Sequence, residues 1–507
     1  MKIQSNPIRL QHIIVLFVLC SIMYFLYLYD VLEMDNFLIS ILASIYLVIS
    51  MSIITDHIKK KGVIEFLHPV IFLLFYWGIP FCLEPLIIAF DIISPDWFLI
   101  RSGGNTRYIP YLQIQAIISV IFLYCGFNFC FRNRPTNQHN TTDNSTSKIP
   151  ERKWEKLSGI LGVIISFSMD IVYIYYTDIT GSSIVATEGY GFPPTVFYFL
   201  KLFGHAIYGQ FMTLCGTLSI LLILFSTSMD KIKIRSFLLL SITFYMTLGI
   251  LTFHKLRLMM PFIILIYSFY YWQRTMNIKR EMLSVIFILA LITLFPIILT
   301  GRGEYSKTDY RIINGFNKDE ILYLVNKMKP EDFLYVLTRF ESLDNATVIC
   351  SQTPSVIPYK YGQSYLEGII NIPGIIPRLA PEGAGTFTNR FAREYSLIPL
   401  FDIKSGITLT QISEVYMNFG IYFIPIVMFL YGIFYKKIYY YMVNGKSDNA
   451  KFISFYLWFI WVMMHPGFPF ESTIISLIKD GYGVAMILLI INLPSKLLNR
   501  TDQRRSQ

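Results

Sequence analysis

The feature that most constrains this chain is the repetition of long apolar runs from one end of the sequence to the other. Hydrophobic residues make up 54% of its 507 residues and charged residues only 15%, whereas soluble domains carry roughly a quarter charged residues. A helix needs about 20 apolar residues to cross the hydrocarbon core of a bilayer. The pattern therefore predicts an all-α polytopic membrane protein.

We expect about 12 transmembrane helices. The expected spans cover residues 11–29, 36–54, 66–83, 109–131, 157–177, 195–226, 236–253, 257–272, 281–300, 412–435, 452–468 and 474–494. The first run is too long for the core of a typical signal peptide and no small-residue cleavage site follows it, so we interpret it as a retained span. The stretch 84–108, with Glu84 and two prolines, is a candidate for a re-entrant segment.

The basic residues predict how the chain is oriented. About 25 Lys and Arg residues fall in the loops on the side of the N-terminus and about 4 in the short loops opposite, which is the asymmetry of the positive-inside rule. Both termini are then expected to be cytoplasmic. This distribution also explains most of the net charge of +10, so we expect no nucleic-acid partner. Residues 133–150, rich in Asn, Thr and Ser, are interpreted as a cytoplasmic linker.

Residues 301–411 form the one long loop, and by the same alternation the loop faces outward. It contains helical patterns at 318–328 and 331–349, so we predict a large, partly helical, folded cap between helices 9 and 10. The expected organisation is transmembrane helices 1–9 in residues 1–300, the cap loop in 301–411, helices 10–12 in 412–494 and a cytoplasmic tail in 495–507.

Outward-facing arginines are the first candidate functional residues. Guanidinium groups bind phosphate oxygens bidentately, so a cluster of them at a membrane surface suggests a lipid that carries pyrophosphate. The simpler alternative for each arginine is contact with lipid headgroups or pairing with loop carboxylates. The arginines in question are Arg257, Arg302, Arg311, Arg339, Arg378, Arg390 and Arg393.

Two further candidates lie close to predicted spans. Glu414 stands where the loop enters the tenth span; a carboxylate there is costly unless paired, so it is a functional candidate, against the alternative of a glutamate exposed to water. Asn418, four residues on, shares its helix face. His465 lies in the turn between the last two spans and could act as a general base or contact phosphate, although a lone histidine is more often structural.

The sequence lacks the signatures of several common cofactor sites. We find no Walker A loop, no H-E-x-x-H, no G-x-S-x-G and no D-x-D pair. The six cysteines form no C-x-x-C pair. We therefore expect no cofactor and no metal, and neither ATP nor a nucleotide sugar as a requirement.

The order of features in residues 302–425 resembles the O-antigen polymerase family, the Wzy-type oligosaccharide repeat-unit polymerases. The matching elements are Arg339-Phe340-Glu341-Ser342 with Asp344, Tyr361-Gly362-Gln363-Ser364-Tyr365, Ile376-Pro377-Arg378, and Ile412 to Gly420, whose E-x-Y-x-N-F-G pattern is the most specific; Arg257 and Arg302 match by position and type. One departure is that Leu379-Ala380-Pro381-Glu382, rather than lysine and proline, follows Arg378.

The resemblance implies a glycosyltransferase of the bacterial inner membrane, acting at the periplasmic face without metal or nucleotide. It would transfer a growing chain from undecaprenyl pyrophosphate onto a hydroxyl group of a new lipid-linked unit, with inversion by analogy with single displacement. The implied partners are the donor and acceptor glycans and membrane lipids, and a chain-length regulator is a further candidate partner. Arg257, Arg302, Arg339 and Arg378 would stabilise the leaving pyrophosphate and Asn418 would contact substrate.

The acceptor hydroxyl group needs a positioned base. Glu414 is the first choice for this role, with His465 and Glu394 as reserves. O-antigen, capsule and exopolysaccharide all remain possible products.

Three other functions stay open. An O-antigen ligase would use the same lipid donor. A transporter or flippase of the lipid-linked glycan would also have about 12 spans, although its substrate site would be expected near the middle of the membrane. A scaffold whose loop binds an acidic partner could also use the outward arginines.

Overall fold

The computed structural model of the protein describes residues 34–61, 67–92, 99, 105–129, 160, 163–164, 342–370, 387–397, 409–445, 448–467, 469–474 and 477. Within these ranges the regular structure is entirely helical. Four helical stretches there are long and apolar enough to cross a membrane: Asp35–Lys59, Pro69–Ala89, Ile109–Asn128 and Ile421–Asn444. The predicted class, an all-α membrane protein, is confirmed at this level.

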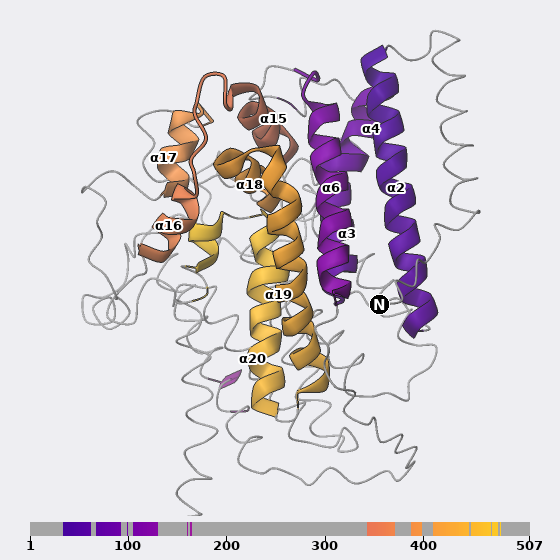
Figure 1. Cartoon of the computed structure of the whole chain (residues 1–507), viewed down its shortest axis with the longest axis vertical. Helices are drawn as coiled ribbons and strands as arrows, with labels where there is room; N and C mark the ends of the chain where they lie inside the picture. Colours follow the sequence, from indigo (N-terminus) through magenta and orange to yellow (C-terminus); the bar gives the residue numbers. More distant parts are fainter. Residues whose placement is uncertain are drawn as a thin grey trace, which may run out of the picture. The chain divides into compact units, whose positions relative to one another are not determined.

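The helices between residues 34 and 128 and between residues 342 and 467 belong to one compact unit, Met1–Asn133 with Leu337–Leu477. Its long helices stand side by side with similar axis directions (Figure 1). They are α2 (Met34–Lys61), α3 (Pro69–Gly78) with its continuations η1 (Ile79–Leu83) and α4 (Glu84–Ala89), α6 (Ile109–Asn128), α19 (Ile424–Asn444) and α20 (Asp448–Trp458), which η4 (Phe459–Met464) and η5 (His465–Gly467) continue.

Ring contacts at one end of this bundle fix the relative helix directions. His68, just before α3, lies 4.4 Å from His57 of α2, 4.5 Å from Phe127 of α6 and 4.9 Å from Tyr439 of α19, measured between ring centroids. Since α3 begins where the other three helices end, it runs antiparallel to them. The alternation expected for these four spans requires the same directions.

The helices α6 and α19 approach each other through glycine. A Cβ atom built on Gly126 would lie 2.0 Å from the backbone oxygen of Phe429, and one on Gly432 would lie 2.2 Å from that of Leu123. In membranes, helices associate mainly by van der Waals packing, and small residues allow close backbone approach. These two glycines therefore set the spacing of the pair.

Two predicted span boundaries differ from the structure. The predicted tenth span, 412–435, is divided by Gly420, whose φ of 77° interrupts the helix, and the membrane-length helix is Ile421–Asn444. The helix continues past Lys436, whose Nζ atom donates to the backbone oxygen of Phe129 at 3.0 Å. Near the third span the helix continues through Glu84 to Ala89, so this part of 84–108 extends the third helix instead of forming a re-entrant turn.

The other predicted boundaries lie largely outside the described residues. This holds for the spans at 11–29, 157–177, 195–226, 236–253, 257–272 and 281–300, for most of 474–494, for the linker 133–150 and for the tail 495–507. Within the predicted span 452–468, the described residues 452–467 are helical in α20, η4 and η5.

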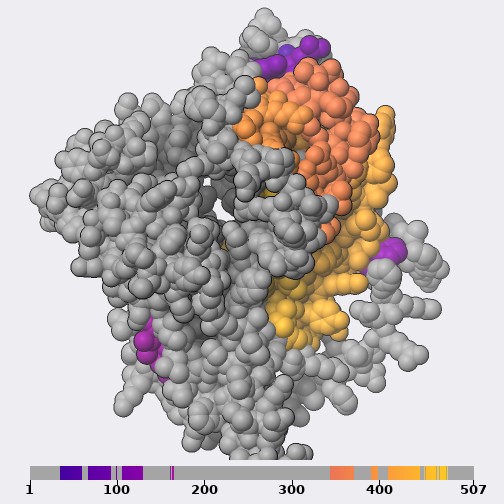
Figure 2. Space-filling view, turned by 90° about the vertical axis from the view of Figure 1, so that its left-hand side faces the viewer, coloured from indigo at the N-terminus to yellow at the C-terminus, as the bar shows by residue number. Residues whose placement is uncertain are grey.

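The described parts of the long loop lie in the upper half of the view in Figure 1, with α15 against the first half of α6. They form α15 (Ser342–Gln352), α16 (Gln363–Ile370) and α17 (Phe387–Glu394). The next helix, α18 (Gln411–Phe419), covers the first part of the predicted tenth span. Gln115 of α6 donates to Cys350 Sγ of α15 at 3.5 Å. Residues 343–350 of α15 are all buried, so this helix packs into the bundle instead of lying on its surface. Figure 2 shows the loop segments above the yellow-orange residues of the C-terminal helices.

Candidate functional site

The short helix α18 carries the central candidates, and its limits follow from its sequence. Thr410 has extended backbone angles and its Oγ1 accepts from the Ser413 N–H at 3.1 Å, which is an N-cap. Gly420 ends the helix, and its N–H donates to the Tyr416 oxygen at 2.8 Å. Although residues 411–418 are all buried, the helix contains Gln411, Ser413, Glu414 and Asn418. A buried helix this polar requires partners for each side chain.

Glu414 is held by a backbone amide from a distant part of the chain. Its side chain is fully buried, and the Phe470 N–H donates to its Oε2 at 2.9 Å. Among the described residues its second oxygen, Oε1, accepts no hydrogen bond. Burial away from water raises the pKa of the carboxyl group from 4.5 to about 7, with Ser364 and the Phe470 amide opposing the rise and the nearby Glu471 adding to it.

Asn418 joins two of the sequence elements on which the resemblance rests. Its Oδ1 accepts from the Gly362 N–H at 3.0 Å, and its Nδ2 donates to Ser364 Oγ at 2.7 Å and to the Glu414 backbone oxygen at 2.8 Å. The Tyr361 N–H also donates to the Asn418 backbone oxygen at 2.9 Å. The Y-G-Q-S-Y element is thereby fixed against the E-x-Y-x-N-F-G element, and the contacts of Asn418 position Glu414.

Two glycines make this junction possible. Gly362 has φ of 86°, and a Cβ atom there would lie 3.2 Å from Cζ of Phe419. Gly420 has φ of 77°, and its Cβ atom would lie 3.0 Å from the ring of Tyr359. Both residues adopt the left-handed backbone region where L side chains are strained. The glycine of each element is therefore required by its conformation and by close packing.

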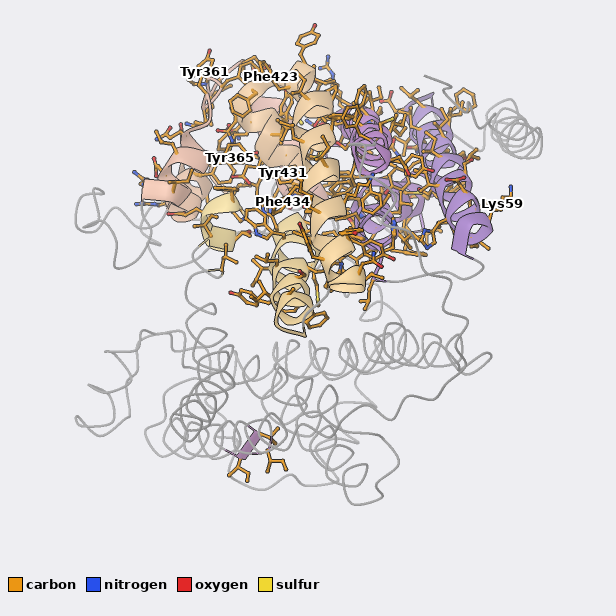
Figure 3. The ribbon with its side chains drawn as sticks, turned by 60° about the horizontal axis from the view of Figure 1, so that its bottom comes forward. Lys59, Tyr361, Tyr365, Phe423, Tyr431 and Phe434 are labelled. Atoms are coloured by element: carbon orange, nitrogen blue, oxygen red, sulfur yellow. The ribbon has the colours of Figure 1, made fainter. Side chains whose placement is uncertain are left out.

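Aromatic rings surround the Glu414 side of the junction. The ring of Tyr365 is stacked on that of Phe419, with centroids 6.0 Å apart and an angle of 6°, and it makes an edge contact with Phe470 at 5.0 Å. The Tyr365 hydroxyl group also interacts with that of Tyr431 on α19. Figure 3 shows Tyr365 and Tyr431 close together between the loop helices and the long helices.

His465 is buried near Glu414, and both of its ring nitrogens are engaged. Thr473 Oγ1 donates its single proton to the Pro469 oxygen at 3.1 Å, so at 3.0 Å it accepts from Nδ1–H of His465. In the neutral ring Nε2 then accepts from the Tyr431 hydroxyl group at 2.9 Å. This arrangement favours a role in fixing the turn that contains Phe470 over the predicted role as a base.

One predicted cation, Arg390, and the second reserve base, Glu394, form ion pairs in the structure. Glu394, at the end of α17, forms an ion pair with Lys360. Arg390 of α17 forms one with Glu367 of α16, which is the simpler alternative considered for the loop arginines. The remaining predicted pyrophosphate ligands, Arg257, Arg302, Arg339 and Arg378, lie outside the described residues.

Changing Glu394 to glutamine is therefore expected to alter activity less than twofold. The side chain of Glu394 is 44% exposed, and an exposed ion pair contributes about 0.2–1 kcal/mol. Polymer formation by membranes that contain equal amounts of the wild-type and variant protein would test this. A loss of activity as large as that caused by changing Glu414 would make Glu394 a candidate general base again.

Gln411, Tyr431 and Tyr435 complete the surroundings of Glu414, and the sequence did not single them out. Gln411 precedes Glu414 by three residues, so the helical period places them on one face; that spacing was the available signal. The two tyrosines lie in a run rich in aromatic residues and differ in no visible way from their neighbours. Only the tertiary structure identifies them.

The described residues contain no group of three or more His, Cys, Asp or Glu side chains that could hold a metal ion. No protein-family model, no curated protein and no solved structure matches the chain.

Proposed function

We propose that this protein polymerises lipid-linked oligosaccharide repeat units and that Glu414 is its general base. The observation that carries the proposal is the state of the Glu414 carboxyl group: it is buried, one oxygen is fixed by the Phe470 N–H, and the other accepts no hydrogen bond from the described residues. A pKa of about 7 suits a base that works near neutral pH.

In the proposed reaction Glu414 Oε1 takes the proton of an acceptor hydroxyl group. The hydroxyl oxygen forms a bond to the anomeric carbon of the donor glycan as the bond from that carbon to the pyrophosphate oxygen breaks. The bonding electrons leave with undecaprenyl pyrophosphate, and a single displacement inverts the anomeric carbon. Glu414 then returns its proton to water.

We further propose that the protein has about 12 spans in a bacterial inner membrane, that its termini are cytoplasmic and that the site lies at the periplasmic face. Arg257, Arg302, Arg339 and Arg378 would stabilise the negative charge that develops on the pyrophosphate. No ATP is needed, because the donor linkage already stores the energy of transfer.

A transporter or flippase of the lipid-linked glycan is the second candidate, and Glu84 favours it. This residue lies in a membrane-length helix, is 2% exposed, and its Oε1 accepts no hydrogen bond from the described residues. Carboxylates inside membrane helices often mark ion or substrate pathways. A translocation role would make Glu84, and not Glu414, the residue on which function depends.

Deletion of the gene from its host separates these functions. We expect the surface lipopolysaccharide of the deletion strain to show core with a single repeat unit on a gel, and the wild-type gene to restore the ladder of longer chains. Bare core would instead indicate ligation or flipping. An unchanged ladder, together with unchanged capsule and exopolysaccharide, would reject polymerisation.

The rate of polymerisation is expected to rise with pH and to level off above about 7. A base acts when deprotonated, and burial holds the pKa of Glu414 at about 7, so its active fraction falls about tenfold for each pH unit below that value. Initial rates with purified protein and extracted lipid-linked units, measured from pH 5 to pH 9, would show this rise in rate. A flat profile, or a limb centred near 4.5, would contradict the assignment.

A further inference from the structure

The orientation of the Gln411 side chain can be derived from its partners. Its amide nitrogen Nε2 lies 2.6 Å from the Tyr435 hydroxyl group, and that group donates to the Trp461 backbone oxygen at 3.0 Å. Because a hydroxyl group has only one proton, Tyr435 must accept from Gln411. The amide NH₂ therefore faces Tyr435, and the carbonyl oxygen Oε1 points away from it.

That oxygen resembles Glu414 Oε1, and also Gln113 Oε1 on α6, in accepting no hydrogen bond from the described residues. Gln411 is 1% exposed, and among the described residues its Oε1 accepts no hydrogen bond. Gln411 and Glu414 are three residues apart on α18 and share a face of the helix. Tyr431 interacts with the side chains of both. Two buried acceptor oxygens thus belong to side chains on one face of α18.

Two buried oxygens that accept no hydrogen bond from the described residues are costly for the fold. A buried polar group that lacks its hydrogen bond costs about 1–3 kcal/mol, and most such groups in folded proteins have partners. A donor would satisfy each oxygen, and at Glu414 the proposed reaction supplies one, the acceptor hydroxyl group. A neighbouring hydroxyl group of the same sugar would supply a donor for Gln411.

We infer that Gln411 determines acceptor specificity: its Oε1 accepts a hydrogen bond from a second hydroxyl group of the acceptor sugar, next to the one that Glu414 deprotonates. The inference rests on the proposed function and narrows its substrate to an acceptor that presents two neighbouring hydroxyl groups. Tyr435, which fixes the amide, is a positioning residue for this contact.

The test combines Gln411→Ala with acceptors that each lack one hydroxyl group. The purified full-length protein would receive lipid-linked units from the deletion strain as donor, and short-lipid versions of the repeat unit, natural or singly deoxygenated in the acceptor sugar, as acceptor. For wild type, one deoxy acceptor that retains the reacting hydroxyl group should lower kcat/KM about tenfold. Gln411→Ala should lose about tenfold with the natural acceptor and nothing further with that deoxy acceptor.

Gln113→Ala is the matched control. Gln113 of α6 is also fully buried, and its amide donates to the Ile39 backbone oxygen at 3.1 Å, but it lies on a different helix. Any effect of this change should be the same for all acceptors. It measures what the loss of a buried glutamine does to the fold.

Three results would overturn the inference. One is an equal loss for every acceptor in Gln411→Ala, which would mean a packing role alone. Another is no loss at all. The third is a shifted pH profile without dependence on the acceptor. It would mean that Gln411 only accepts a hydrogen bond from the protonated carboxyl group of Glu414. If wild type forms no product with the natural acceptor, the proposed function fails and the inference fails with it.

Discussion

Glu414→Gln is expected to lower polymerisation by about 10²- to 10⁴-fold, the usual contribution of a positioned general base. The amide of glutamine has nearly the shape of the carboxylate, and its oxygen can still accept from the Phe470 N–H that now bonds Oε2 at 2.9 Å. It cannot take a proton from a hydroxyl group. The variant should therefore reach the membrane in normal amounts and leave the deletion strain with single repeat units.

The matched variants for this prediction are Glu414→Asp and Glu394→Gln. Aspartate keeps the base but withdraws it by one methylene group, so it should retain part of the activity that glutamine abolishes. Glu394→Gln removes a loop carboxylate that is paired with Lys360 and should stay active. A full ladder from Glu414→Gln at the normal amount of protein would remove Glu414 from the mechanism.

Gly432→Ala is expected to prevent the protein from folding stably. The added Cβ atom would lie 2.2 Å from the Leu123 oxygen and 2.7 Å from the Phe127 nitrogen. Both are backbone atoms of α6, so no side-chain rotation relieves the clash and the two helices must separate. The expected cost is about 3 kcal/mol, the upper part of the range for overpacking.

Thermal unfolding in detergent and the amount of protein in the membrane would measure this effect. The control is Gly78→Ala in α3, where the new Cβ atom would meet only Cε1 of Tyr46 at an ordinary 3.6 Å. That change should be neutral or slightly stabilising, because alanine favours helix more than glycine does. Equal melting temperatures for Gly432→Ala and wild type would contradict the close packing of α6 and α19.

The sequence predicted the features that depend on local pattern. Apolar runs located the four membrane-length helices, because the bilayer sets their length. Glu414 was identified because a carboxylate beside apolar helix is costly, and the spacing that relates it to Asn418 is a property of any α-helix. These predictions needed no knowledge of which segments meet.

Other features depend on contacts between distant segments, and local pattern could not supply them. The donor to Glu414 is the backbone N–H of Phe470, 56 residues away. Every residue except proline has a backbone N–H, so the sequence does not indicate which one donates. The division at Gly420 was missed because a single glycine in an apolar run does not show the sign of its φ angle. The pairing of Arg390 with Glu367 was one of two alternatives that charge alone could not separate.

The contact between α6 and α19 also bears on how the protein is made. Lys436 and Phe129, which join the two helices at one end, are 307 residues apart. At about 5–20 residues per second, a ribosome completes α19 roughly 15–60 s after α6. During that interval the surface of α6 around Gly126 lacks its partner α19. Chaperones that bind unassembled membrane helices should therefore associate with nascent chains that end before residue 430.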